Sequence, residues 1–293
     1  MVQDLLQLLV SGLATGAIYA LVAIGFTLLW QTAGTVNFAQ GEFVVLPAFL
    51  ILGAMTAEQM PFLAAILVGG GITVILLGFV FKRFIVDPMQ KHGGMPLTIA
   101  TMALGLFIKE ALKDGYGAEA HAFPSLLPTG NFTVSGVALS TQSVLVLLIA
   151  VVAVVALQLL LTRTRTGRCM QAVAQNASVA RILGIDVQRM ILYTFLINAA
   201  LVTLAALLIT PVYLAKFSNG EALGLAAFIA ALVGGFNQVR GAIVGGLLLG
   251  VVDNLAAYYV SATYRGAVPL LVLITVILFR PQGLLGRAEE RTV

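Results

Sequence analysis

The sequence predicts an all-α fold, a polytopic bundle of transmembrane helices. Hydrophobic residues make up 60% of the 293 residues, and only 10% are charged. A typical soluble domain is about 45–50% apolar and about 25% charged, and its solvated face needs far more charge than this chain has. The composition therefore argues against a soluble enzyme, a disordered protein and a nucleic-acid-binding domain.

Apolar runs along the chain give nine candidate membrane spans, with eight as a close alternative. A helix needs about 20 residues to cross a hydrocarbon core about 30 Å thick. Four runs reach this length cleanly, whereas the runs of the C-terminal third are short and contain glycine, which suggests tilted or broken spans. The nine runs cover residues 5–30, 43–55, 62–81, 96–112, 142–161, 190–210, 222–236, 241–260 and 266–279. The whole chain, residues 1–293, is expected to form a single transmembrane domain.

The basic residues predict how the chain is oriented. With nine spans and the N-terminus outside, 12 of the 16 Lys and Arg residues fall in inner loops and 4 fall outside. Cytoplasmic loops carry such an excess of basic residues, so we expect the C-terminus in the cytoplasm. The first basic residue is Lys82, so the N-terminal apolar run lacks the positive region of a cleavable signal peptide.

Two predicted loops are long enough to carry function. Residues 113–140 fall outside and are expected to be irregular, because they contain Pro124, Pro128, Gly130 and Asn131. Residues 162–189 fall inside and contain five arginines.

The inner loop contains a predicted short helix. Asn176 is a suitable N-cap for a helix from Ala177 to Leu183, and Gly184 lies where a left-handed C-cap is expected. Apolar residues recur at helical spacing and form one face: Val179, Ile182 and Leu183. Such a face either docks on a partner or lies on the membrane surface, held there by the arginines. Periodicity alone does not decide between the two.

A second candidate segment is residues 34–43, with the sequence GTVNFAQGEF. It places Asn37, Gln40 and Glu42 between two very apolar runs. Polar groups at membrane depth are costly and tend to line a cavity or a pathway. The simpler interpretation, favoured on sequence alone, is a short loop whose polar residues are in water.

The third candidate segment is residues 234–246, GGFNQVRGAIVGG, followed by Asp253 and Asn254. Its glycines permit close approach of helices or a re-entrant turn. Asp253 is the acidic residue of an otherwise uncharged run, and at membrane depth it would mark a pathway or a structural pair. A span that ends near Leu249 would instead leave Asp253 at the interface.

Motifs for catalysis are missing from the sequence. It has no phosphate-binding loop for ATP, no G-x-S-x-G elbow and no H-E-x-x-H helix. The sole cysteine, Cys169, forms no internal disulfide, and His92 and His121 are too scattered for a metal cluster. No pair of carboxylates sits at convergent helical spacing within a span, which disfavours a membrane-bound enzyme and a proton-driven transporter.

Four motifs occur in order along the chain, over residues 34–43, 167–189, 234–246 and 278–286. On these motifs, and nearly end to end from SGLATGAIYALVAIGFTLLW to LFRPQGLLG, the chain resembles the permease subunits of bacterial ABC importers for branched-chain amino acids. It looks like the shorter of two paired permeases. The resemblance implies a helical bundle of the ABC importer permease type. The related importers for urea and short-chain amides share most of these motifs, so the substrate stays open between these classes.

The resemblance also implies partners. These are a second related permease, two cytoplasmic ATPase subunits that bind the ATP, a periplasmic substrate-binding protein and the lipid of the bacterial inner membrane. The chain itself would bind no cofactor and no nucleic acid. The inner-loop helix would be the coupling helix, received by an ATPase subunit.

Two groups of candidate site residues follow. The coupling group comprises Arg168, Gln171, Asn176, Ala177, Val179, Arg181, Leu183, Gly184 and Asp186, and the pathway group comprises Asn37, Gln40, Glu42, Asp253 and Asn254. The rival interpretation is a channel or secondary transporter that works alone, with Asp253 and Asn254 as its candidate relay.

Overall fold

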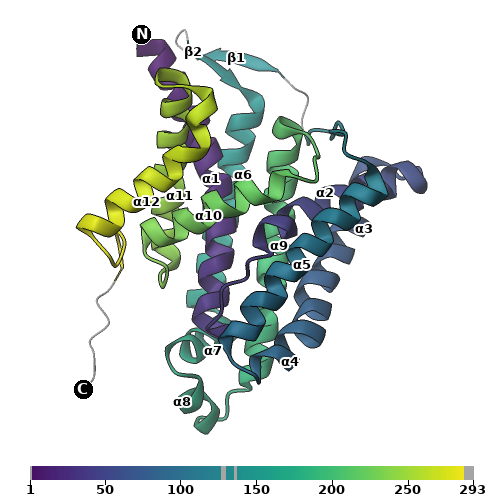
Figure 1. Ribbon diagram of the computed structural model, residues 1–293, viewed down its shortest axis with the longest axis vertical. Coiled ribbons are helices and arrows are strands. Elements are labelled where there is room, and N and C mark those ends of the chain that lie inside the picture. Colours follow the sequence, from purple (N-terminus) through teal and green to yellow (C-terminus); the bar gives the residue numbers. More distant parts are fainter. Residues whose placement is uncertain (1, 127–129, 135–136, 287–293) are drawn as a thin grey trace. The chain divides into compact units, whose positions relative to one another are not determined.

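The computed structural model describes residues 2–126, 130–134 and 137–286 and is predominantly helical (Figure 1). Its elements, in chain order, are α1 Val2–Ala33, α2 Gln40–Ala57, α3 Phe62–Thr73, η1 Val74–Val80, η2 Lys82–Val86, α4 Asp87–Gln90, α5 Gly94–Tyr116, β1 Asn131–Val134, β2 Val137–Ser140, α6 Thr141–Arg163, α7 Arg165–Gln175, α8 Ala177–Ile182, α9 Val187–Tyr213, α10 Asn219–Gly234, α11 Val239–Tyr259, η3 Ala262–Ala267 and α12 Val268–Phe279.

Each of the nine predicted spans corresponds to a helical stretch, and the predicted spans 222–236 and 241–260 end two residues and one residue too late. Within the described residues, seven helical stretches are long and apolar enough to cross a membrane. Two further apolar helices, Asn219–Gly234 and Arg265–Phe279, are shorter. The predicted polytopic helical bundle is therefore confirmed, and the shortness predicted for the C-terminal spans holds for these two but not for α11.

The chain divides into two compact units, each assembled from segments far apart in the sequence. Unit 1 comprises Met1–Thr27, Leu127–Val151 and Leu225–Val293, and unit 2 comprises Leu28–Leu126 and Val152–Gly224. The polar segment at residues 34–43 and the inner-loop helix belong to unit 2, whereas Asp253 and Asn254 belong to unit 1.

In unit 1, α1 and α11 approach closely through small residues. A Cβ atom added to Gly250 would lie 2.2 Å from the Gly16 backbone, and one added to Gly16 would lie 2.7 Å from the Gly246 carbonyl oxygen. Small residues allow such backbone contact between membrane helices. The sequence left two roles open for the glycines of residues 234–246, close approach of helices or a re-entrant turn. Gly246 has the first of these roles.

The other glycines of this stretch form a tight corner between α10 and α11. A Cβ atom on Gly234 would lie within 1.9 Å of the Gly241 oxygen, so neither residue has room for a side chain. The segment that follows α12 closes on this corner, because Leu284 N donates to Val233 O at 2.8 Å and Leu285 N donates to Gly234 O at 3.0 Å. These bonds satisfy carbonyls that the end of α10 leaves without a helical partner.

In unit 2, α2 and α9 pack with the third span. The Phe81 ring lies edge-on to the Phe43 ring, with 5.0 Å between centroids, and also meets the Phe195 ring at 5.7 Å. Gly78 has no room for a side chain, because an added Cβ would lie 2.6 Å from Leu196 Cδ2. The core of this unit is therefore aromatic at the helix crossing.

The third span is longer than predicted. Its helical stretch runs from Phe62 to Gln90, past the expected end at Phe81. Residues Val74–Val80 and Lys82–Val86 are wound as π-helix, in which backbone hydrogen bonds join residues five apart. Lys82 and Arg83, which the topology placed in an inner loop, lie within this helical stretch.

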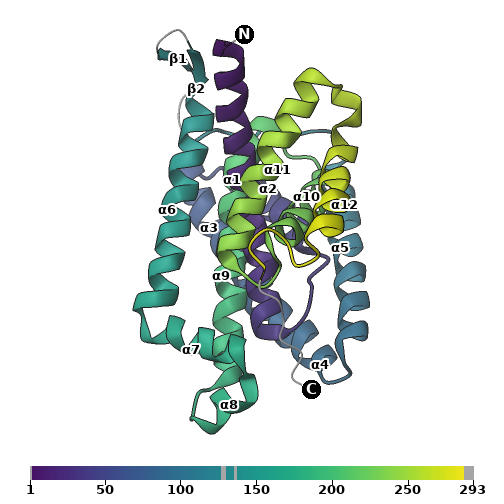
Figure 2. The same ribbon diagram turned by 90° about the vertical axis from the view of Figure 1, so that its left-hand side faces the viewer.

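The two long loops are more ordered than predicted. α5 continues to Tyr116, and β1 and β2 form an antiparallel hairpin with Asn131 opposite Ser140. The prediction of an irregular segment over residues 113–140 was wrong for these parts, while Pro128 lies outside the described residues. The inner loop contains a second helix, α7, which turns sharply away from the end of α6 (Figure 2).

Candidate functional site

The predicted inner-loop helix is present as α8. Asn176 caps its N-terminus, since its Oδ1 accepts hydrogen bonds from Ser178 N and Val179 N, each at 3.0 Å. The helix begins at Ala177 as predicted and ends at Ile182, with Leu183 as its C-cap residue. The N-cap prediction is therefore confirmed, and the predicted end was one residue too late.

Gly184 ends α8 in the predicted left-handed conformation, with a φ of +80°. Gly184 N donates to Arg181 O and Ile185 N donates to Ala180 O, each at 3.0 Å. This pair of bonds is the Schellman arrangement, which occupies the last carbonyls of a helix. α8 is thus fixed at both ends by its own sequence.

The apolar face of α8 is open. Ile182 is 85% exposed and Leu183 is 72% exposed, whereas Ala180 on the opposite side is buried. Figures 1 and 2 show α8 beyond the N-terminal end of α9. Large apolar side chains so exposed form a surface of the kind that a partner protein or a membrane covers.

The predicted polar residues around α8 are exposed as well. They are Arg168, Gln171, Asn176, Arg181 and Asp186. Asp186 has a role that the sequence did not reveal, because its Oδ1 accepts a hydrogen bond from Arg189 N at 3.0 Å and so caps α9. The coupling surface, defined as α8 and these polar residues, therefore includes the residue that caps the start of α9.

α7 supports this surface from behind. Its buried residues are Gly167, Met170 and Val173. Gly167 packs directly on α6, where an added Cβ would lie 2.1 Å from Leu160 O. One face of α7 is therefore packed against its neighbours. The spacing of three residues between Met170 and Val173 is the sequence signal that could have predicted this helix.

The polar residues of the segment at 34–43 are buried. Asn37, Gln40 and Glu42 are at most 7% exposed, and α2 already begins at Gln40. The favoured interpretation of a short loop in water was therefore wrong. These side chains are buried because the first turn of α2 packs against neighbouring helices.

Gln40 finds its partner on α9. Gln40 Nε2 donates to Asn198 Oδ1 at 2.7 Å, and Asn198 Nδ2 donates to Gln40 Oε1 at 3.1 Å. Asn37 Nδ2 also donates to Gln40 Oε1, at 3.3 Å. Asn198 was missed by sequence reasoning, although an amide inside the apolar run 190–210 is a signal for such an interhelical bond.

Glu42 lies at a crossing of α2 and α10 made by glycines. A Cβ atom on Gly41 would lie 2.1 Å from Gly220 O, and one on Gly220 would lie 1.4 Å from Glu42 Oε2. The Glu42 carboxylate therefore occupies the space that a side chain at position 220 would need. Within the described residues, Glu42 Oε2 has no hydrogen-bond partner.

An ion pair lies near this carboxylate. Lys109 Nζ donates to Glu221 Oε1, and both residues are close enough to Glu42 to interact with it electrostatically. We define the polar cluster as Asn37, Gln40, Glu42 and Asn198 with this Lys109–Glu221 pair. Neither member of the pair was a sequence candidate, because each sits near the end of an apolar run.

Asp253 is buried in the middle of a helix. α11 continues to Tyr259, so the helix itself does not end near Leu249. Arg265 forms a bidentate ion pair with the carboxylate, with Nη2 2.7 Å from Asp253 Oδ2 and Nε 3.0 Å from Oδ1. Tyr19 OH donates to Oδ2 at 3.3 Å. The geometry favours the structural pair over a pathway residue.

Asn254 is engaged in the same unit. Its Nδ2 donates to Thr15 Oγ1 at 3.2 Å and to Gly250 O at 3.0 Å. These bonds join α11 to α1 beside the glycine contact. Asp253 and Asn254 lie in unit 1 and the polar cluster lies in unit 2, so the pathway candidates divide between the two units.

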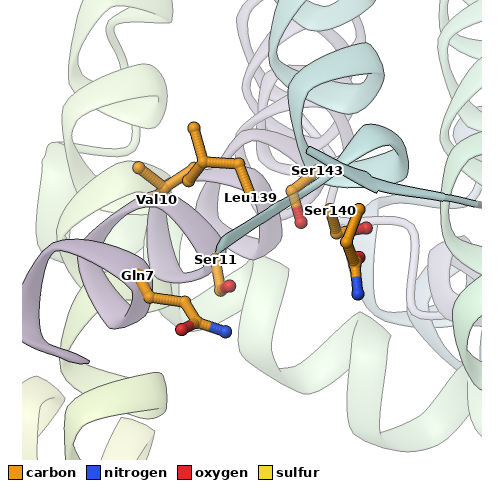
Figure 3. A pocket seen from close by; sticks show the side chains of 7 residues that line it. Gln7, Val10, Ser11, Leu139, Ser140 and Ser143 are labelled. Carbon is orange, nitrogen blue, oxygen red and sulfur yellow. The ribbon is translucent and has the colours of Figure 1, made fainter. Parts of the chain in front are cut away.

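One small cavity lies in unit 1 between the start of α1 and the hairpin (Figure 3). Its volume is about 60 Å³, far below the 300–1,000 Å³ or so of a typical small-molecule site. It is lined by Gln7, Val10, Ser11, Asn131, Leu139, Ser140 and Ser143. None of the predicted site residues lines it.

Comparisons with known proteins agree with the resemblance seen in the motifs. The family model described as "Branched-chain amino acid transport system / permease component" matches residues 8–277. The high-affinity branched-chain amino acid transport system permease protein BraD of Pseudomonas aeruginosa is 33% identical, over 98% of this chain and 98% of its own. LivH of Escherichia coli, a permease protein with the same description, is 30% identical over 98% of this chain and 97% of its own.

A more distant relative extends the likeness. The probable branched-chain amino acid transport permease protein LivH of Methanocaldococcus jannaschii is 26% identical over 91% of this chain and 88% of its own. The matched region includes all of the candidate residues, from Asn37 to Asn254. The chain therefore belongs to the family of permease components of the branched-chain amino acid transport system.

Proposed function

We propose that this chain is the membrane subunit of an ATP-driven importer for branched-chain or other hydrophobic amino acids. The observation that carries the proposal is the coupling surface. A capped helix with an exposed apolar face stands at the end of a unit made of spanning helices, which is what a subunit driven from outside the membrane requires. The names of BraD and LivH favour amino acids over urea and short-chain amides as the substrate.

The proposed partners supply what this chain lacks. Two ATPase subunits bind the ATP and receive α8, a second related permease completes the pathway, and a periplasmic protein delivers the substrate. The chain itself holds no cofactor and catalyses no reaction in this scheme. The coupling surface then faces the cytoplasm of a bacterial cell, with the N-terminus outside the inner membrane and the C-terminus inside.

The proposed mechanism is alternating access. Closure of the ATPase subunits moves α8 as a rigid body, and α9 moves with it because Asp186 caps α9 directly after the α8 C-cap. ATP can shift the equilibrium only if the inward and outward states differ in their contacts with the partners. The exposed Ile182 and Leu183 provide such contacts.

The polar cluster is the proposed pathway element of unit 2. Gln40 and Asn198 satisfy each other in this structure, so opening the α2–α9 contact exposes two amides that a polar substrate group can bond. Asp253 and Asn254 keep a place among the pathway candidates only if the Arg265 pair opens during transport. Their hydrogen bonds to Arg265 and Thr15 give more direct support to a structural role within unit 1.

The deciding experiment is reconstitution of the four-subunit complex with its binding protein in proteoliposomes. We expect ATP-dependent uptake of radiolabelled leucine and stimulation of ATPase activity by the leucine-loaded binding protein. Uptake of urea but not leucine would replace the substrate assignment. Uptake by the permease without ATPase subunits would instead support the rival channel or secondary transporter.

A further inference from the structure

Lys82 is a buried cation whose side chain has no place in the scheme above. It is 7% exposed and lies inside the helical stretch Phe62–Gln90 that forms the third span. Its Nζ lies 3.0 Å from Asp87 Oδ1 and donates to Gln188 Oε1, also at 3.0 Å. A buried ammonium group is paired in this way because removing an unpaired ion from water costs roughly several kcal/mol of folding free energy.

The contact with Gln188 joins the third span to the root of the coupling surface. Gln188 is the second residue of α9, directly after the capping residue Asp186 and the first helical residue Val187. Val187 is buried, and Met190 N donates to Asp186 O at 3.1 Å. Gln188 therefore lies in the first turn of the helix that begins just after the Schellman turn of Gly184 and Ile185.

Lys82 also occupies an unusual stretch of helix. It is the first residue of the π-helical stretch Lys82–Val86, and the stretch Val74–Val80 precedes it. π-helical turns are rare and occur frequently at functional sites. Lys82 therefore lies where the winding of the third span departs from a regular α-helix.

Aromatic packing joins this part of the third span to α2. Phe81, the neighbour of Lys82, lies between the rings of Phe43 and Phe195. Phe43 follows Glu42 in the first turn of α2, next to the polar cluster. The contacts from α8 to the polar cluster thus run through α9, Lys82 and Phe81, all within unit 2.

We propose that Lys82 is a positioning residue that couples the coupling surface to the third span, so that displacement of α8 changes the winding at Lys82 and moves Phe81 against α2. This inference rests on the proposed function of α8. An apolar residue at position 82 would be cheaper in a membrane span than a lysine. Lys82 is therefore expected to serve the transmission of movement rather than stability.

The test compares variants of the reconstituted complex in proteoliposomes, with leucine uptake and ATP hydrolysis measured side by side. Lys82→Met removes the ammonium group, and Gln188→Met removes only its link to α9 and keeps the pair with Asp87. Lys82→Arg is the conservative variant. Arg83→Met is the matched control, because the Arg83 side chain is 68% exposed and its contact with Asp87 is long, with 4.0 Å between Nη1 and Oδ2.

Uptake per ATP hydrolysed is the decisive quantity. We expect it to fall at least about fivefold in Lys82→Met and in Gln188→Met, the lower end of typical coupling between sites. ATP hydrolysis and complex yield should stay within about twofold of wild type, with Lys82→Arg recovering most of the coupling. Arg83→Met should behave as wild type. Because Gln188 is exposed, its variant tests the link even if Lys82→Met fails to assemble.

Two results would overturn the inference without touching the proposed function. One is unchanged uptake per ATP in Gln188→Met and Lys82→Met. The other is a proportional loss of uptake, hydrolysis and complex yield in both variants, which is the mark of a merely structural residue. If the wild-type complex itself shows no ATP-driven leucine uptake, the proposed function fails, and the inference fails with it.

Discussion

The side-chain amides of Gln40 and Asn198 bond to each other twice, Nε2 to Oδ1 at 2.7 Å and Nδ2 to Oε1 at 3.1 Å. They join α2 to α9 across 158 residues of sequence. Both side chains are buried, at 0% and 1% exposure. This pair fixes the first turn of α2 against the helix that carries the coupling surface.

Removing one amide should cost more stability than removing both. Asn198→Leu leaves Nε2 of the buried Gln40 amide without its acceptor, which costs about 1–3 kcal/mol. Replacing both amides removes that unpaired group and sacrifices only the longer bond from Asn37 Nδ2 to Gln40 Oε1. We therefore expect the double variant Gln40→Leu with Asn198→Leu to melt at a higher temperature than Asn198→Leu. Thermal unfolding of the purified complexes in detergent measures the order. A double variant that melts below both single variants would contradict it.

Position 220 should tolerate no side chain. In Gly220→Ala the new Cβ would lie 1.4 Å from Glu42 Oε2 and 3.1 Å from Glu42 N, so the buried Glu42 carboxylate must leave its position. Overpacking of this kind costs about 1–3 kcal/mol. We expect a reduced yield of folded protein and a lower melting temperature, measured by size-exclusion chromatography and thermal unfolding in detergent.

The matched control for position 220 is Gly71→Ala. Gly71 also lies in a helix, but an added Cβ has no atom within 4 Å. This variant should be as stable as wild type or slightly more stable, since alanine is the better helix former. Equal behaviour of the two alanine variants would show that the Gly220 contact is not tight.

Asp253 and Arg265 should behave as a structural pair. Arg265→Gln leaves a buried carboxylate without its main cation, and breaking a buried pair in this way costs about 3–5 kcal/mol. Adding Asp253→Asn removes that unpaired charge and should restore most of the melting temperature and of the leucine uptake. Restored stability without restored uptake would instead assign Asp253 to the pathway, and thermal unfolding with uptake assays separates the two.

Local signals predicted the coupling helix because its geometry depends on neighbours close in sequence. The Asn176 cap reaches residues two and three positions ahead, and the Gly184 cap reaches back at most five. Both caps therefore depend only on residues within five positions of the capping residue. The positions of the helices follow in the same way from the length of each apolar run.

Partners far apart in the sequence could not be predicted in this way. Asn37, Gln40 and Glu42 have the composition of a hydrated loop, and only their packing against Asn198 and Gly220 shows that they are buried. The Lys82 link to Gln188 spans 106 residues and was hidden for the same reason. Basic residues near a span end usually indicate a loop, which is why Lys82 was assigned to one.

Cys169 tests the predicted orientation. It is the sole cysteine, it is partly exposed, and it lies in α7 beside the coupling surface. If that surface faces the cytoplasm, a membrane-permeant maleimide should label intact cells and an impermeant one should not. Labelling by the impermeant reagent after the membrane is opened is the control. Labelling from outside intact cells would reverse the orientation.

Gly184→Val should separate ATP hydrolysis from uptake. Gly184 has a φ of +80°, and an added side chain has open space around it, so backbone strain alone acts on the variant. A β-branched residue in this left-handed conformation costs about 1–2 kcal/mol or more and should distort the end of α8. Gly184→Asn, which tolerates that conformation, is the control. We expect membrane insertion to persist while substrate-stimulated ATPase activity and uptake fall in the valine variant only. Normal stimulation in Gly184→Val would show that the C-cap of α8 does not matter for coupling.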